Sequence, residues 1–193
     1  ARAWSRNKAD EKAIAAGCRF DTFRAAYAVW WIERFCNLYE GQTGRLILRG
    51  CHQCHKDPKE FPEWNDEAKA HYLKRSEKHL ACIKAGHRID WQFDCTMRMF
   101  GWVRWSSKHQ EWIRRHTHAS IWIAKKNKKS PTLAAWAMYM MAGDGEPGQH
   151  VFFAAKDGQQ SREIAGKHAV EMLERSEELL SECTINRTLC QIT

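Results

Sequence analysis

The fold prediction for this chain rests on the stretch Ile121-Trp122-Ile123-Ala124-Lys125-Lys126-Asn127-Lys128-Lys129-Ser130. Its first residues are typical of a buried strand, the lysines and the asparagine predict a polar loop, and Ser130 predicts the start of a helix. A phosphate-binding loop needs this context, because backbone N–H groups at a helix N-terminus hold the phosphates. A lysine then neutralises the β/γ oxygens and a Ser or Thr hydroxyl binds Mg²⁺; Lys129 and Ser130 stand at those two positions.

The two glycines of the G-x-x-x-x-G-K-[ST] pattern are missing from this loop. Their positions are occupied by Ile123 and Lys128. The second position is one where a positive φ is expected, so a lysine there predicts either local strain or a different loop shape. Spacing alone therefore leaves two interpretations open, a nucleotide site and a solvated lysine-rich surface.

Outward from the loop, predicted strands and helices alternate through the second half of the chain. We predict strands at 119–123 and 150–155, helices at 130–141 and 160–180, and a further strand beginning within 185–192. This order is typical of an α/β fold with a parallel sheet. We therefore predict a P-loop NTPase-type parallel sheet, preceded by a helical segment and a Cys/His-rich insertion.

The first half of the chain predicts mainly helices. We expect one over 22–38, with Asp21 as its N-cap, and another over 65–85, with a short strand at 46–48 between them. The resulting domain prediction has three parts: an N-terminal helical segment (1–50), a Cys/His-rich insertion (51–88), and the N-terminal part of a P-loop core (89–193) that continues beyond the chain.

Composition favours a folded protein of the cytoplasm. Hydrophobic residues make up 44% and charged residues 28% of the 193 residues, a balance unlike that of a disordered chain. The longest apolar run, 133–142, is about half of the roughly 20 residues that cross a bilayer, and no secretory signal is visible. In a reducing compartment, the eight cysteines favour metal binding or burial over disulfides. The net charge of +8 allows an anionic partner.

The segment Cys51-His52-Gln53-Cys54-His55 predicts a metal site. Cys51 and Cys54 have the spacing of a zinc-binding pair, and His79 and Cys82, three residues apart on a predicted helix, supply a second pair. Such a zinc ion would staple an insertion that has few apolar residues. The competing ligands are His55, His71 and His87. A chance clustering in a polar insertion is the alternative, and the C-x-x-C-H haem signature ranks below zinc because haem attachment needs export.

The basic and aromatic stretch 102–116 has two interpretations. It has the composition of a surface that binds a phosphate backbone. A hairpin with aromatic side chains packed inward and arginines outward explains it equally well, and we favour the hairpin.

The lysine-rich stretch also resembles the variant Walker A motif of tailed-phage large terminases, hydrophobic-Pro-Arg/Lys-Lys-Asn-Gly-Lys-Ser/Thr. Other segments are similar to the same family in order and spacing, and the resemblance covers most of the chain outside 51–88. These segments are 10–21, 90–92, 99–102, 134–140, the Gly143-Asp144-Gly145-Glu146-Pro147-Gly148 turn, 151–160 and 176–179.

The resemblance implies the ATPase portion of a DNA-packaging terminase large subunit, which couples ATP hydrolysis to translocation of double-stranded DNA into a procapsid. By position, Lys129 would contact the β/γ-phosphates, Ser130 the Mg²⁺, and Lys125 or Lys126 the γ-phosphate. Asn127 and Lys128 would complete the loop, and Trp91 and Gln92 would lie near the adenine. The implied partners are DNA, a portal, a small terminase subunit and further copies of the chain in a ring, with no membrane.

Two departures from the family support an alternative. No apolar strand ending in Asp-Glu, the pair that holds Mg²⁺ and activates water, follows Ser130, and Lys156-Asp157 offers a single carboxylate. The carboxylate cluster of the family's nuclease domain has no room here either. We expect the chain alone to bind nucleotide poorly and to hydrolyse nothing. The alternative function is a non-enzymatic, zinc-containing nucleic-acid-binding module in which the lysines contact DNA phosphates.

Overall fold

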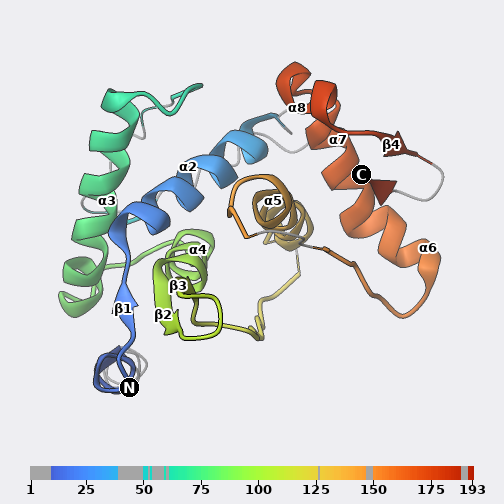
Figure 1. Cartoon of the computed structure of the whole chain (residues 1–193). Coiled ribbons are helices and arrows are strands. Elements are labelled where there is room, and N and C mark those ends of the chain that lie inside the picture. Colours follow the sequence, from blue (N-terminus) through green and yellow to red (C-terminus); the bar gives the residue numbers. More distant parts are fainter. Residues whose placement is uncertain are drawn as a thin grey trace. The chain divides into compact units, whose positions relative to one another are not determined.

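The computed structural model describes residues 10–38, 50–51, 53, 59, 61–125, 127–146, 150–187 and 191–193 (Figure 1). The chain forms two compact units, one from Ala1–Trp30 and Leu48–Ile121, the other from Trp31–Ile47 and Trp122–Thr193. Helix α2 (Thr22–Leu38) contributes its first part to one unit and its second part to the other. The two units are described one after the other.

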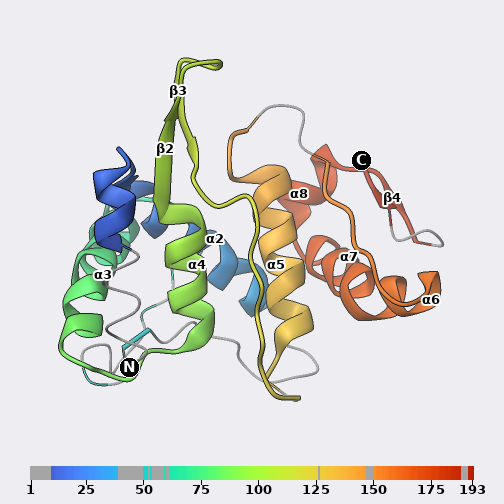
Figure 2. The same ribbon diagram turned by 90° about the horizontal axis from the view of Figure 1, so that it is seen from below.

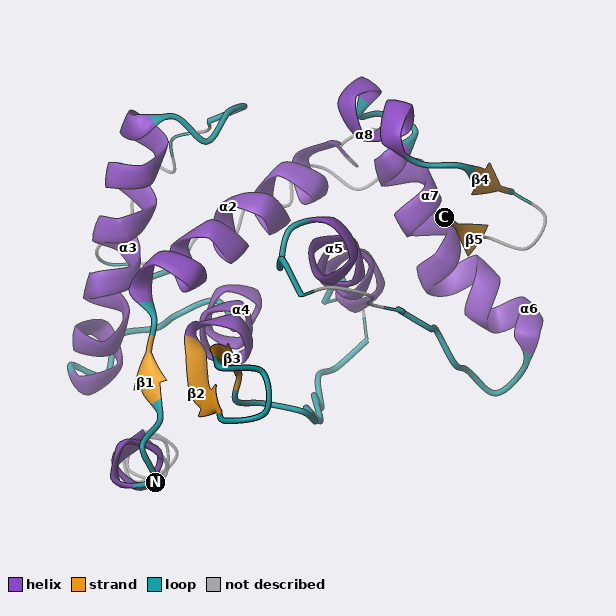
Figure 3. Cartoon of the chain, in the orientation of Figure 1, coloured by secondary structure: helices purple, strands orange, loops and turns teal. Residues whose placement is uncertain are grey.

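The first unit combines helices with a small antiparallel sheet (Figure 3). Its sheet has the order β1-β2-β3, and Phe20 pairs with Trp102 while Trp105 pairs with Trp112. The elements of this unit that follow or precede α2 are β1 (Arg19–Phe20), α3 (Asp66–Lys84), α4 (Trp91–Gly101), β2 (Trp102–Ser106) and β3 (Glu111–Arg114). The favoured hairpin within 102–116 is confirmed, although Trp105 is 46% exposed and so is not packed inward.

Side-chain caps explain where the helices of the first unit begin. The Asp21 carboxylate accepts a hydrogen bond from the Arg24 backbone N–H at 2.9 Å, and the Asn65 side chain accepts one from Ala68 N–H at 2.9 Å. Each bond satisfies a donor that the first helical turn leaves without a partner. The helices predicted over 22–38 and 65–85 are therefore confirmed, and so is the Asp21 cap.

An aromatic cluster forms the core of the first unit between α2 and the segment before α3. Trp30 is buried, with its ring centroid 5.6 Å from that of Tyr27 and 5.3 Å from that of Trp64. Its indole N–H donates to the Phe61 carbonyl at 2.9 Å, so the polar atom of this buried ring is satisfied. The chain has ten tryptophans, and packing in this core accounts for Trp30 among them.

The second unit is mainly helical (Figure 2). Its central helix, α5 (Lys129–Ala142), contacts α7 and buries Trp136, Met138 and Tyr139. The remaining elements are α6 (Gly158–Ser161), the π-helical turn η1 (Arg162–Gly166), α7 (Lys167–Leu173), α8 (Glu177–Glu182) and the antiparallel pair β4 (Ile185–Asn186) and β5 (Gln191–Ile192). The helix predicted over 130–141 is confirmed. The one predicted over 160–180 is interrupted at Glu174–Ser176, and the predicted strand within 185–192 is a small hairpin.

The predicted parallel P-loop sheet is wrong for the residues that the structure describes. Every strand pair among them is antiparallel, and neither 119–123 nor 150–155 belongs to a strand. Trp122 is 93% exposed and Phe152 86% exposed, where burial was expected. An apolar pattern favours an extended backbone, but a β-sheet also needs a neighbouring strand to complete the hydrogen bonds. The prediction inferred the neighbouring strand from the apolar pattern alone. The strand predicted at 46–48 lies outside the described residues.

Among the described residues, none of the helices has both the length and the apolar character that a membrane span requires. The longest of them, α3, has 19 residues and carries charged side chains along its length. The most apolar part of the sequence, 133–142, lies inside the 14-residue helix α5.

Gly101, the last residue of α4, is predicted to tolerate no side chain. A Cβ atom at this position would lie 2.5 Å from Phe20 Cε2 and 2.8 Å from the Ala25 Cβ. We expect Gly101→Ala to lower the free energy of unfolding by about 1–3 kcal/mol, because Phe20 and Ala25 must move away from the new methyl group. Urea unfolding followed by circular dichroism measures the change.

The matched control is Gly158→Ala at the start of α6, where a Cβ atom would meet nothing within 4 Å. This variant should keep or slightly raise the stability, by up to about 1 kcal/mol. Equal behaviour of the two variants would contradict the close packing of α4 on β1.

Candidate functional site

The stretch 123–130 is here termed the lysine loop, and its described residues are 123–125 and 127–130, the last two of which begin α5. Lys128 is the N-cap residue and has a left-handed backbone conformation, φ 51° and ψ 37°. The Asn127 side-chain amide donates to the Ala124 carbonyl at 3.2 Å, and the Thr132 hydroxyl donates to the Lys128 carbonyl at 2.8 Å. The position where the glycine pattern requires a positive φ therefore has one, with lysine in place of glycine.

The Lys129 side chain reaches back across the loop. Its ammonium group donates a hydrogen bond to the Ile123 carbonyl at 2.8 Å, and the residue is exposed. The two ends of the loop are thereby joined through a cationic group at its surface. A neutral carbonyl is a weaker acceptor for an ammonium group than an anionic oxygen, so this bond is one that an anion can replace.

The first turn of α5 has the electrostatics of an anion-binding helix start. The turn contains no acidic residue, and no side chain from Lys128 caps it. The backbone N–H groups of Lys129 and Ser130 have no acceptor within the helix, and Pro131 has no N–H to satisfy. Ser130 is half-buried in this turn. The helix dipole adds partial positive charge to that of the lysines.

Beside the loop, Cys36 of α2 lies in the same unit and is fully buried. Burial and, to a smaller extent, the Glu33 carboxylate raise the pKa of its thiol to about 12, while the Lys128 ammonium acts in the opposite direction. The thiol therefore stays protonated at neutral pH and is a packed, unreactive group there.

The predicted ATP contacts are divided between the two units. Lys125, Asn127, Lys128, Lys129 and Ser130 form the lysine loop in the second unit, and Lys126 lies outside the described residues. Trp91 and Gln92 begin α4 in the first unit and are both half-buried. Their proposed role beside the adenine stays a prediction.

The predicted zinc ligands are only partly brought together. Cys51 and Cys82 lie close to each other and to His87, one of the competing ligands named above, whereas Cys54 and His55 lie outside the described residues. His79 does not join them: its Nε2 atom lies 3.2 Å from Asp94 Oδ1. The sequence signal for His87 is the glycine before it, which ends α3 and turns the chain back.

His79 belongs instead to a buried charged network. Asp94 also contacts Arg98, with Nε of the arginine 3.0 Å from Oδ1, and Arg98 Nη1 donates to Asp10 Oδ1 at 3.0 Å. These groups join α3, α4 and the helical turn at 10–15. The geometry gives His79 a structural role, and the expectation that it completes a Cys₃His site is replaced below.

A pocket of about 420 Å³ opens beside η1 and α7 in the second unit. Arg187 Nε donates to Glu174 Oε1 at 2.7 Å across its wall, so charges of both signs meet there. The lining residues are Arg162, Glu163, Lys167, Val170, Glu171, Glu174 and Arg187. None of them belongs to the predicted ATP or zinc sets, and the pocket is separate from the candidate site.

Position 128 is predicted to tolerate glycine better than a β-branched residue. A left-handed conformation costs a non-glycine residue about 1–2 kcal/mol, partly offset by the greater freedom of glycine in the unfolded chain. We expect Lys128→Gly to keep or raise the free energy of unfolding by up to about 1 kcal/mol, and Lys128→Val to lower it by about 1–3 kcal/mol. Urea unfolding gives both values.

The comparison variant for this test is Gln110→Gly in the β2–β3 turn, where φ is 56°. Its free energy of unfolding should also stay the same or rise, because glycine relieves the strain of a left-handed backbone conformation there too. If Lys128→Gly is destabilised as much as Lys128→Val, the left-handed conformation of the loop is wrong.

Cys36 is predicted to resist alkylation in the folded protein even at pH 9. With its pKa raised to about 12, the folded thiol is almost entirely protonated at that pH, whereas the unfolded thiol is substantially ionised. Mass spectrometry after iodoacetamide treatment should find Cys36 modified only in urea. The half-buried Cys18 and Cys95 serve as internal references, and rapid modification of folded Cys36 would contradict its burial.

Comparison with known proteins provides no further assignment. No family model matches the sequence, and searches of curated proteins and of solved structures found no match.

Proposed function

We propose that this chain carries the nucleotide-phosphate-binding part of a DNA-packaging ATPase of the phage terminase large-subunit type. The observation that carries the proposal is the contact between Lys129 Nζ and the Ile123 carbonyl, 2.8 Å long, over a loop that Lys128 closes in a left-handed conformation. The proposal uses the loop and the start of α5, and does not depend on a parallel sheet.

The Lys129 contact supports the proposal. Its ammonium group joins the first turn of α5 to the carbonyl of the residue six positions earlier. A β- or γ-phosphate oxygen would replace the carbonyl, since charge-assisted hydrogen bonds are about twice as strong as neutral ones. The lysine is therefore placed for phosphate binding with little rearrangement of the backbone.

The other parts of the loop fit the same ligand. The N–H groups of the first turn of α5 would donate to phosphate oxygens, and Lys125, exposed on the loop, would reach the γ-phosphate. The Ser130 hydroxyl, half-buried in the same turn, fits a Mg²⁺ ion bound between the β- and γ-phosphates. When bound, Mg²⁺ neutralises the charge that develops during phosphoryl transfer.

Binding and hydrolysis are separate expectations for this chain. Phosphoryl transfer needs a carboxylate that holds Mg²⁺ and orients water, and the sequence after Ser130 has no Asp-Glu pair at the end of an apolar strand. We therefore propose Mg²⁺-ATP binding for the chain itself. Hydrolysis coupled to DNA translocation, in a ring of subunits on a portal, is proposed for the complete motor.

The test is calorimetric titration of the chain with ATP in the presence of Mg²⁺, repeated for Lys129→Ala. Removing one charge-assisted contact of about 1.5–3 kcal/mol should weaken ATP binding by roughly 10- to 100-fold. The matched control is Lys156→Ala, which removes an exposed lysine of the same unit outside the loop and should leave the affinity unchanged.

Two results would overturn the proposal. One is the failure of the unaltered chain to bind Mg²⁺-ATP, and the other is equal affinity of the unaltered chain and Lys129→Ala. The alternative, a nucleic-acid-binding module, predicts DNA binding that falls steeply with salt and changes little with any single lysine. Titrating double-stranded DNA at two salt concentrations distinguishes it.

A further inference from the structure

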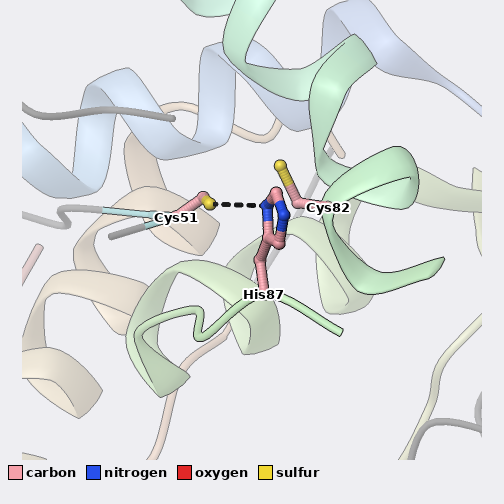
Figure 4. A group of neighbouring side chains, drawn as sticks. All are labelled: Cys51, Cys82 and His87. Atoms are coloured by element: carbon pink, nitrogen blue, oxygen red, sulfur yellow. Dashed lines mark hydrogen bonds between the residues drawn. The ribbon is translucent and has the colours of Figure 1, made fainter. Parts of the chain in front are cut away.

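We propose that Cys51, Cys82 and His87 bind a zinc ion that joins three segments of the first unit. Their candidate ligand atoms, the two sulfur atoms and a ring nitrogen, all lie within 4.8 Å of one another. Figure 4 shows both sulfur atoms beside the imidazole ring of His87. The site shares no residue with the lysine loop, because Cys51, Cys82 and His87 belong to the first unit and the loop to the second.

The distance between Cys51 Sγ and His87 Nδ1 agrees with a shared tetrahedral ion. This distance is 3.5 Å. With Zn–S near 2.3 Å and Zn–N near 2.05 Å, two ligands of a tetrahedral zinc ion lie about 3.6 Å apart for sulfur and nitrogen, and about 3.8 Å apart for two sulfur atoms. The residues therefore need only small side-chain rotations to bind the ion.

The turn that ends α3 fixes the positions of Cys82 and His87 relative to each other. Gly86 has a positive φ of 70°, its N–H donates to the Ile83 carbonyl at 3.1 Å, and the His87 N–H donates to the Cys82 carbonyl at 3.0 Å. This pair of bonds is a Schellman motif, which reverses the chain after a helix and places the residue after the glycine beside the last turn. The backbone thus holds two of the ligands before any ion binds.

Cys51 reaches the same point from a distant part of the sequence. It forms an isolated antiparallel bridge with Ile89, and the Asp90 N–H donates to the Gly50 carbonyl at 3.0 Å. The backbone at 50–51 is therefore attached to the residues directly after His87. Zinc would clamp this attachment to the end of α3, next to a polar insertion with few apolar side chains.

The charge of the site is compensated by its own ligands. Cys51 and Cys82 are buried, and His87 is half-buried. Binding converts two thiols into thiolates and releases two protons, so two negative charges balance the Zn²⁺ ion while the imidazole binds as a neutral ligand. A cluster with no net charge costs less free energy to bury than a Zn²⁺ ion whose charge is not balanced. Cys54 lies outside the described residues, and the proposal rests on the other three.

The experiment measures zinc binding by the full chain under reducing conditions. We expect one zinc ion per chain by elemental analysis after dialysis, and Co²⁺ in its place to show tetrahedral d–d bands and a thiolate-to-cobalt charge-transfer band. Cys82→Ser and His87→Asn should each lower the zinc affinity by at least about 100-fold, since even loss of an outer hydrogen bond to a ligand costs 10- to 100-fold.

Matched controls separate metal ligation from damage to the fold. His71→Asn alters a half-buried histidine of α3 that packs against Phe61 and Tyr72, and Cys18→Ser alters a half-buried cysteine of the same unit. Both variants should keep the zinc affinity of the unaltered chain. Circular dichroism verifies that the ligand variants retain their helices.

A second readout on the unaltered chain does not depend on any variant. Each zinc ion that binds should release about two protons, because two thiols become thiolates. Calorimetry in two buffers of different ionisation enthalpy measures this number. The proposal is overturned if the reduced chain binds no zinc, if His87→Asn binds it as tightly as the unaltered chain does, or if zinc binding releases no protons.

Discussion

Helix α2 carries apolar side chains around most of its circumference, so other parts of the chain must cover it on most sides to shield these side chains from water. Ala25, Ala26, Val29 and Trp30 are buried in the first unit, and Ile32 and Phe35 are fully buried in the second. Polar contacts also attach this helix to other elements of each unit. In the first unit, Arg24 of α2 donates to the Trp112 carbonyl of β3 at 3.3 Å; in the second, Arg34 Nη2 donates to Glu178 Oε2 of α8 at 2.7 Å.

Local chemistry was predictable from the sequence, and pairing between distant segments was not. Asp21 and Asn65 each mark the start of a helix, because the side-chain acceptor and the backbone N–H group that it caps are only three residues apart in the sequence. The segments 119–123 and 150–155 have the composition of strands, but a strand forms only where a neighbouring backbone completes its hydrogen bonds. Short patterns do not contain that information, and the parallel sheet inferred from them was wrong for the described residues.

The same distinction holds for the two candidate sites: features set by neighbouring residues were easier to predict than contacts between distant segments. The missing glycine marked position 128 as one where a positive φ is expected, and left local strain and a different loop shape open; the structure has the positive φ with lysine in place. That His87 lies beside Cys51 and Cys82 in place of His79 was not predictable, because the three-residue spacing of His79 and Cys82 gives only a shared helix face and not what each side chain contacts across the core. His79 meets Asp94, a carboxylate that the sequence analysis did not consider.

Charge balance distinguishes what the two sites are suited to do. In the Cys/His cluster, two thiols supply the negative charge that a divalent cation needs, so the bound site is neutral within the chain and suits a structural role. The lysine loop has four lysines and no acidic residue, and it lies at the positive end of α5. Such a loop gains most from a ligand that brings negative charge with it. The charges present therefore suit the cluster to a divalent cation and the loop to an anionic ligand, in agreement with the two proposals.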